Sequence, residues 1–222
     1  MLAREIIEKV GEDGFCIFEL DKETKGVLAK VELNDLEDGF HVNNNIHSDF
    51  VSSTTQIKSL IGSLKDFVSN KNIAWNMINV ARVVKKSSPE KYRTHFDSHL
   101  YTLVVPLMVS DDGTDLRGQL YLAPNLRKQP VNDLINVLQK TLAFRWRGEK
   151  GFLKLKSLDK IRVFDLKKGQ AILFNGSRSL HGNLENASNA TRITLITHMS
   201  DPFPHGIGSW VRKIRSLTGM RK

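Results

Sequence analysis

His95 and Asp97 are the residues of this sequence whose types and spacing best suit metal chemistry. They lie between two apolar runs, at 75–85 and 101–109, that are typical of strands. In extended backbone, side chains two positions apart leave the same face, so this imidazole and this carboxylate point into the same space. One further histidine would complete a two-His-one-carboxylate triad, the ligand set that holds non-haem Fe(II) and leaves coordination positions open.

The third ligand must come from a distant part of the chain, and His181 is the candidate. A turn at Gly169 leads into an apolar run at 170–174, and His181 follows that run after a short loop. In a Greek-key arrangement a late strand can lie beside an early one. We therefore predict one metal site formed by His95, Asp97 and His181.

Arg192 and Thr194 form a candidate anion site near the end of the chain. They alternate along the apolar run 191–199, so both side chains leave one face. A guanidinium offers a bidentate fork and the hydroxyl one more donor, which suits a carboxylate. A keto acid could bind the metal at one end and this pair at the other. The alternative is an internal salt bridge, because an unpaired arginine is costly to bury.

Other residues near the site each have a structural alternative. His99 could bind substrate or be a packed imidazole, and Arg82 could contact an anionic substrate or extend along the surface. Trp146 could line the entrance or anchor a helix. Asn76 and Asn79 could each reach the keto-acid end. They are three positions apart, so their side chains leave opposite faces of the strand, and the sequence pattern does not show which face is turned to the site. Asn79 is the one included among the predicted co-substrate residues.

The elements that position these residues are many short strands and a few helices. Apolar residues at helical spacing predict helices at 2–10 with a stop at Gly11, at 57–68 with Ser53 or Thr54 as cap, and at 131–142. Apolar runs predict strands at 14–20, 26–33, 75–85, 101–109, 117–123, 161–166, 170–174 and 191–199.

This order predicts a mainly β (α+β) fold, a jelly-roll sandwich or barrel backed by N-terminal helices. The helical pattern at about 130–147 interrupts the strand series, so we expect an insertion packed on the barrel or over its mouth. A basic stretch at about 207–222 predicts a C-terminal helix. The sequence contains no repeat or linker, which predicts a single domain over 1–222.

Composition is that of an ordinary globular protein, with 222 residues, 40% hydrophobic and 26% charged. The single cysteine, Cys16, lies among apolar residues, which predicts a buried, inert thiol and a cytoplasmic location. No apolar run approaches the length of a membrane span, so no membrane partner is expected. The net charge of +9 permits an anionic partner, but the basic residues are spread out, which favours a solvated basic surface.

The metal and anion residues together resemble those of the Fe(II)/2-oxoglutarate-dependent oxygenases, closest in style to the phytanoyl-CoA dioxygenase-like branch. The resemblance rests on His95-x-Asp97 and on His181-x10-Arg192 with Thr194 two residues later. Residues 117–125 resemble the G-x-L-x-x-x-P segment of that branch, and 168–181 resemble its G-D-x-x-x-F…H segment.

The resemblance implies a double-stranded β-helix (cupin-like) fold in which the triad binds Fe(II). It also implies that 2-oxoglutarate chelates the iron and that Arg192 and Thr194 hold its far carboxylate. With O2, such an enzyme hydroxylates an unactivated C–H of a small molecule and releases succinate and CO2. Retention of Asp97 implies oxygen insertion or desaturation, because the related halogenases lack this carboxylate.

Two departures from the branch limit what carries over. Gln170 replaces the usual Asp after the turn glycine, and 125–127 replaces a Gly-Ser-His segment on the substrate side. The substrate of the phytanoyl-CoA enzymes is therefore not inferred for this chain. The alternatives are a basic jelly-roll protein that binds nucleic acid, which is not favoured, and an oxygenase acting on nucleic acid or on a carrier-bound substrate.

Overall fold

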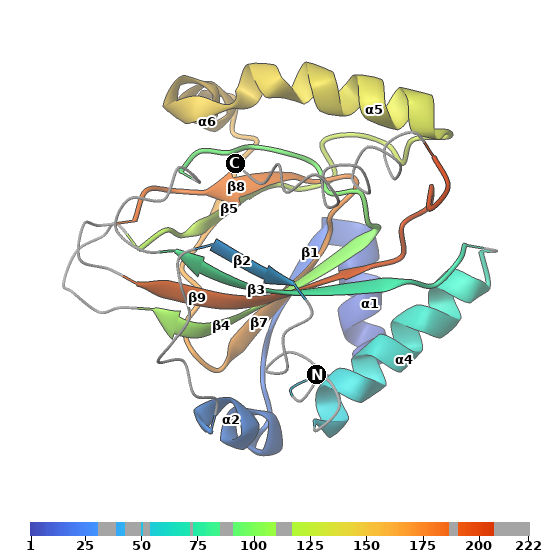
Figure 1. Cartoon of the computed structure of the whole chain (residues 1–222), viewed down its shortest axis with the longest axis vertical. Helices are drawn as coiled ribbons and strands as arrows, with labels where there is room; N and C mark the ends of the chain where they lie inside the picture. Colours follow the sequence, from blue (N-terminus) through green and yellow to red (C-terminus); the bar gives the residue numbers. More distant parts are fainter. Residues whose placement is uncertain are drawn as a thin grey trace.

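The computed structural model describes residues 1–30, 39–42, 50, 54–71, 73–84, 91–109, 117–186 and 191–206 (Figure 1). The helices are α1 (Ala3–Asp13), α2 (Lys22–Ala29), α4 (Thr55–Ser69), α5 (Asp133–Leu142), the 3₁₀ turn η1 (Ala143–Trp146) and α6 (Gly148–Ser157). The strands are β1 (Phe15–Glu19), β2 (Gly39–Val42), β3 (Met77–Val84), β4 (Tyr101–Val109), β5 (Leu120–Ala123), β6 (Arg162–Phe164), β7 (Gln170–Asn175), β8 (Leu180–Asn183) and β9 (Arg192–Met199).

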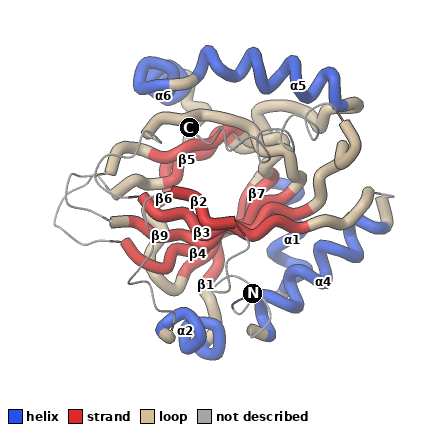
Figure 2. The backbone as a smooth tube through the Cα atoms, in the orientation of Figure 1, coloured by secondary structure: helices blue, strands red, loops and turns tan. Residues whose placement is uncertain are grey.

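The strands form two antiparallel sheets, which lie in the centre of the molecule with helices around them (Figure 2). The larger sheet has the order β1-β7-β4-β9-β3-β2, and the smaller has the order β6-β5-β8. Consecutive strands of the chain are often not neighbours, as in a jelly roll. The structure confirms the predicted mainly β, double-stranded β-helix fold with helices behind the larger sheet.

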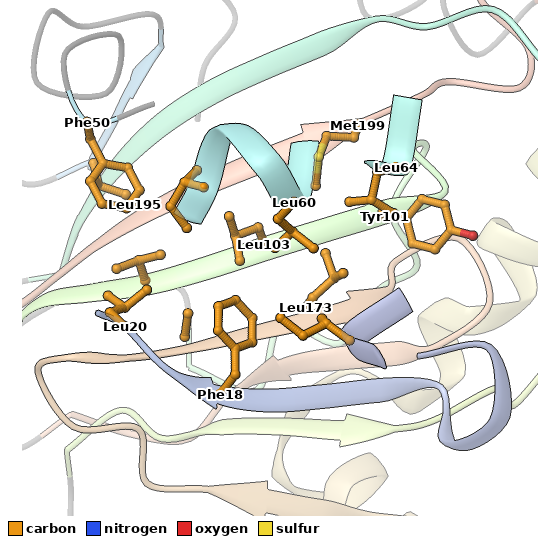
Figure 3. Close-up of a cluster of buried hydrophobic side chains, with 14 of the residues drawn as sticks. Phe18, Leu20, Phe50, Leu60, Leu64, Tyr101, Leu103, Leu173, Leu195 and Met199 are labelled. Carbon is orange, nitrogen blue, oxygen red and sulfur yellow. The ribbon is translucent and has the colours of Figure 1, made fainter. Parts of the chain in front are cut away.

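One face of the larger sheet packs against the N-terminal helices (Figure 3). Leu103, Leu173 and Leu195 come from β4, β7 and β9, and they meet Leu60 and Leu64 of α4 in one buried cluster. Residues two apart on these strands share this face, while their neighbours point to the other face. The helices thus hold the sheet from behind.

The opposite face of the larger sheet is also buried. Val104 and Ile172 from this face pack with Leu120 and Leu122 of β5, and Ile196 of β9 packs against the same cluster. A strand that is covered on both faces has a continuous apolar sequence, which explains why β4 and β7 do not alternate. This inner face, between the two sheets, carries the candidate site.

Several element predictions were wrong in detail. Helix α1 continues past Gly11 and ends at Gly14, whose φ of 86° suits a glycine cap. The strand predicted at 26–33 is helix α2 where the structure describes it, because the Asp21 side chain accepts a 2.7 Å hydrogen bond from the Thr24 N–H and starts a helix. The polar stretch 35–45 contains β2.

The later part of the chain contains two elements that the sequence analysis did not predict, helix α6 and strand β8. Helix α5 begins after Asn132, whose side chain accepts a hydrogen bond from Ile135 N–H. The C-terminal helix predicted at about 207–222 and the cap candidate Ser53 lie outside the described residues. In the part of the chain that is described, no helix has the length and apolar character needed to cross a membrane.

Candidate functional site

His95 and His181 are brought together by their own backbones. The N–H of each donates to the C=O of the other, at 2.9 and 3.0 Å, as in a hydrogen-bonded antiparallel pair. Side chains of such a pair leave the same face of the sheet. Their ring centroids are 4.4 Å apart. The extended segment before Asp97 thus pairs with β8 through its backbone, and this pairing places the two imidazoles side by side.

The same ring nitrogen is occupied in both histidines. Nδ1 of His95 lies 2.9 Å from Arg93 O, and Nδ1 of His181 lies 3.0 Å from Ser179 O. A carbonyl can only accept, so Nδ1 carries a proton, and in the neutral form of each ring the lone pair is on Nε2. These Nε2 atoms lie 3.5 and 3.4 Å from the two carboxylate oxygens of Asp97. Both rings therefore present a ligand atom to one point.

Asp97 is held by groups from three parts of the fold. Its N–H donates to Gly176 O at 3.0 Å, and Thr102 of β4 donates its hydroxyl to Oδ2 at 2.5 Å. Because that hydroxyl proton is used, Thr102 Oγ1 accepts from Nδ1 of His198 at 3.1 Å. A Cβ at Gly176 would lie 2.7 Å from Asp97 Oδ2, so only glycine fits there. The carboxylate is fixed before any metal binds.

Electrostatics keep the carboxylate ionised. Burial alone would raise the pKa of Asp97, but the imidazoles of His181 and His198 hold it well below its usual range. Burial lowers the pKa of His181, and the attraction of Asp97 outweighs this and raises it. Burial of the cluster lowers the pKa of His95, whose side chain is still 44% exposed, and the neighbouring His181 lowers it further. A carboxylate and a readily deprotonated imidazole are what a metal ligand set requires.

The donor set fits a divalent metal ion. One ligand atom from each of His95, Asp97 and His181 lies within 4.8 Å of the others. Two imidazoles and one carboxylate on one side suit the facial arrangement of non-haem Fe(II), and their outer atoms are hydrogen-bonded as second-shell contacts usually are. The structure thus brings together all three residues that the sequence predicted.

Arg192 and Thr194 lie on the inner face of β9, as their spacing predicted. Both are buried, and Arg192 is only 3% exposed. The guanidinium donates from Nη1 to Arg117 O at 3.1 Å, while Nε and Nη2 have no hydrogen-bond partner among the residues that the structure describes. Burial and the nearby charge of Arg82 lower the pKa of Arg192 to about 10. Buried N–H groups without partners indicate a place for an acceptor such as a carboxylate.

The alternative of an internal salt bridge does not apply to Arg192 within the described residues, since none of their carboxylates lies within salt-bridge distance. The charge of Asp165 raises the pKa of Arg192 and so opposes the effect of burial, but Asp165 forms no salt bridge with Arg192 among the described contacts. The incompletely bonded guanidinium of Arg192 is therefore a second feature, after the triad, that fits a 2-oxoglutarate site.

The strand register separates Arg82 from Asn79. Arg82 pairs with Thr194 across β3 and β9, so it shares the inner face, and its Nη1 donates to Asn183 Oδ1. Asn79 pairs with Thr197 and leaves the opposite face. The prediction that Asn79 contacts the co-substrate is wrong, because three positions along a strand reverse the direction of a side chain.

The remaining substrate candidates have different surroundings. His99 is buried and stacks on His198 with ring centroids 5.3 Å apart, one contact away from Asp97. Trp146 packs against a small cluster that includes Leu155 and carries the cations of Arg145 and Lys154 on its ring. These contacts are those of the anchoring alternative, and contact of Trp146 with a substrate stays a prediction.

Three residues important for the site's geometry were not predicted: Thr102, Gly176 and Arg127. Thr102 had a signal, since it is the polar inward-facing residue of an otherwise apolar strand. Arg127 lies 4.1 Å above the Phe96 ring and donates to Ser177 O at 2.6 Å. It therefore joins the residue between His95 and Asp97 to the residue after Gly176.

Comparison with known proteins supports the fold. No protein-family model and no curated protein sequence matches the chain. Iron-bound HygX from Streptomyces hygroscopicus matches with a TM-score of 0.60 at 13% identity, over 91% of this chain and 88% of that one. EctD from S. alaskensis with bound Fe gives 0.57 at 13% identity, over 90% and 76%. A Pseudomonas putida prolyl-4-hydroxylase gives 0.51 at 11% identity, over 90% and 98%. At these identities the chain shares their fold.

Proposed function

We propose that this protein is an Fe(II)/2-oxoglutarate-dependent oxygenase that hydroxylates an unactivated C–H bond. The observation that carries the proposal is the combination, on one inner face, of the His95, Asp97 and His181 ligand set with the buried, incompletely bonded guanidinium of Arg192. A metal site alone would suit many functions. A metal site beside an orphaned cation suits a bidentate keto acid that has a second carboxylate.

Each residue has a role in this reaction. His95, Asp97 and His181 would hold Fe(II) on one side and leave its other positions open. Arg192 would bind the far carboxylate of 2-oxoglutarate with two N–H groups, assisted by the Thr194 hydroxyl. When bound, the iron activates O2, and the balanced reaction converts 2-oxoglutarate, O2 and R–H into succinate, CO2 and R–OH.

The interior between the sheets supplies the dry surroundings that this chemistry needs. Leu120, Leu122, Ile172 and Phe174 are fully or almost fully buried there. Excluding water strengthens the contact of Arg192 with a carboxylate and protects a reactive oxidant from side reactions. Thr102 keeps one oxygen of Asp97 engaged, which leaves the other for the metal.

The substrate is proposed to be a small molecule, with an anionic one favoured by Arg82 on the inner face. HygX, EctD and the prolyl hydroxylase are neighbours by fold, so their own substrates are not transferred. Placement in the phytanoyl-CoA dioxygenase-like branch rests on sequence motifs, around 117–125 and 168–181 and in the opening segment 12–18.

The first test is metal and co-substrate binding without oxygen. Anaerobic Fe(II) and 2-oxoglutarate should together give a metal-to-ligand absorption band, and Mn(II) should raise the melting temperature of the apo-protein. His95→Ala, Asp97→Ala and His181→Ala should each lose both signals, whereas the exposed His205→Ala should retain them. Succinate release on admission of O2 completes the test. Full metal occupancy in all three site variants would refute the proposal.

A further inference from the structure

Helix α5 exposes its apolar residues. Leu134, Leu138 and Leu142 recur at helical spacing and are 67%, 58% and 54% exposed, and Val131 before the helix is also exposed. Amphipathic helices of globular proteins normally turn this stripe inwards. The sequence predicted an insertion packed on the barrel or over its mouth, and in the structure the leucine stripe of this insertion faces outwards.

The orientation of α5 is fixed by polar contacts on its inward face. Asn136, the one buried residue of the helix, accepts from Arg127 Nη2 at 3.0 Å, and Gln139 accepts from Arg127 Nη1 at 2.9 Å. Lys140 donates to Ser98 Oγ at 2.7 Å. Burial lowers the pKa of Arg127 to about 10, and rotating α5 to bury its leucines would break these bonds around a partly buried cation. The outward leucines are therefore part of the fold.

Positive charge surrounds this apolar stripe. Residues 131–160 contain seven Lys and Arg against three Asp and Glu. Arg147 lies 3.9 Å from the centre of the exposed Phe144 ring, and exposed Leu153 of α6 follows exposed Lys150 and precedes exposed Lys154. Helices α5 and α6 form the outermost layer of the molecule above β5 and β8 (Figure 1). Exposed leucines among cations are the composition of a segment that lies at a lipid interface.

We propose that the outer face of α5, η1 and α6 binds an anionic lipid surface. Leucine and phenylalanine side chains would enter the headgroup region while the neighbouring Lys and Arg contact lipid phosphates and carboxylates. A second copy of the chain is a poorer occupant, because it would bring two cationic surfaces together. The expectation of no membrane partner considered only spanning segments, and surface binding needs none.

This surface is one layer from the candidate metal site. Lys140 contacts Ser98, and Phe96 lies in the same small cluster as Ala143 of η1. A protein bound through this face would hold its His95 and Asp97 segment close to the lipid. Binding does not depend on turnover, so failure of this inference would leave the proposed oxygenase intact.

The test is co-sedimentation of the full chain with phosphatidylcholine vesicles that either contain or lack phosphatidylserine. The protein should bind the anionic vesicles at least about tenfold more tightly, and binding should weaken as salt is added. Leu134→Gln/Leu138→Gln should reduce binding by about tenfold or more, because two inserting side chains are lost. Phe67→Gln, which alters an exposed apolar residue on α4, is the matched control and should bind normally.

Charge is tested in the same way. Lys150→Glu/Lys154→Glu should weaken binding to anionic vesicles, while Lys58→Glu/Lys65→Glu on α4 makes the same charge change elsewhere and should have a smaller effect. Circular dichroism establishes that each variant is folded. Equal binding to both vesicles, no binding, unchanged binding of the leucine variant, or a dimer that the leucine substitutions dissociate would each overturn the proposal.

Discussion

Replacing Arg192 with Met should stabilise the apo-protein and greatly weaken its binding of 2-oxoglutarate. Arg192 is 3% exposed, and two of its N–H-bearing nitrogens have no hydrogen-bond partner in the described part of the chain. A buried donor without an acceptor costs about 1–3 kcal/mol. Methionine fills a similar volume and needs no hydrogen bond, so the substitution removes this cost at the loss of one bond to Arg117 O.

The expected size follows from these contacts. Two unpaired nitrogens at about 1–3 kcal/mol each, less about 1 kcal/mol for the lost hydrogen bond, give a gain of about 1–5 kcal/mol, which overlaps the range found when buried ionic groups are replaced by apolar ones. For a chain of this size, each kcal/mol raises the melting temperature by about 2–4 °C. The far carboxylate of 2-oxoglutarate would meanwhile lose its cation, at about 3–5 kcal/mol or roughly a hundred- to several-thousandfold in affinity.

Two measurements decide this prediction. Thermal unfolding of the apo-protein should show a higher melting temperature for Arg192→Met, and anaerobic titration should show weaker 2-oxoglutarate binding with Mn(II) affinity nearly unchanged. Arg192→Lys keeps the charge without the fork and should be intermediate in co-substrate binding. Arg162→Met, at an exposed position on β6, is the control. A destabilised Arg192→Met with normal 2-oxoglutarate binding would mean that the guanidinium is structural.

Three further outcomes are expected. Thr102→Val, which removes the hydroxyl from Asp97 Oδ2, should weaken Mn(II) binding measured by calorimetry about 10- to 100-fold, whereas Thr102→Ser should largely restore it. Gly176→Ala should lower both the melting temperature and the metal affinity, because its Cβ would lie 2.5 Å from Thr102 Oγ1; unchanged values would contradict the close approach. Burial raises the pKa of Tyr121 to about 12. The protonated side chain therefore contributes to the stability of the protein, and this contribution is fully present below about pH 10 and is lost as the pH rises through about 12. Chemical unfolding should show this loss, of about 2–3 kcal/mol, in the wild type and not in Tyr121→Phe.

The sequence was a good guide to the arrangement of the candidate metal ligands because that arrangement depends on simple strand parity. His95 and Asp97 need only two extended residues, and Arg192 and Thr194 need the same. The contact between His95 and His181 was inferred from topology, but its cause was missed. Strand β8 is short and contains Gly182, so no periodic pattern marks it. It exists because its backbone pairs with β5 and with the segment at His95.

The choice of Asn79 failed for a reason that parity could have exposed. Asn79 and Arg82 are three positions apart on one strand, so both cannot face the site. Only the pairing of Arg82 with Thr194 decides which of them does. Thr102 and Gly176 were missed for another reason. Their effect on Asp97 comes from close approach between β4 and the turn after β7, and no local pattern encodes such a distance.

Helix α5 shows how tertiary contacts override periodicity. Its apolar periodicity predicted an insertion packed on the barrel or over its mouth, but Arg127 is held over Phe96 and needs acceptors on the helix side. Asn136 and Gln139 supply them, and the leucines are left outside. The bonds to a partly buried guanidinium decide the rotation of the helix because an unsatisfied charge costs more than exposure of a few leucines.

Arg127 therefore connects the two surfaces for which functions are proposed. It contacts the residue between two candidate metal ligands, the loop beside Gly176 and the inward face of α5. One side chain thus supports the position of Asp97 and turns the leucines outwards.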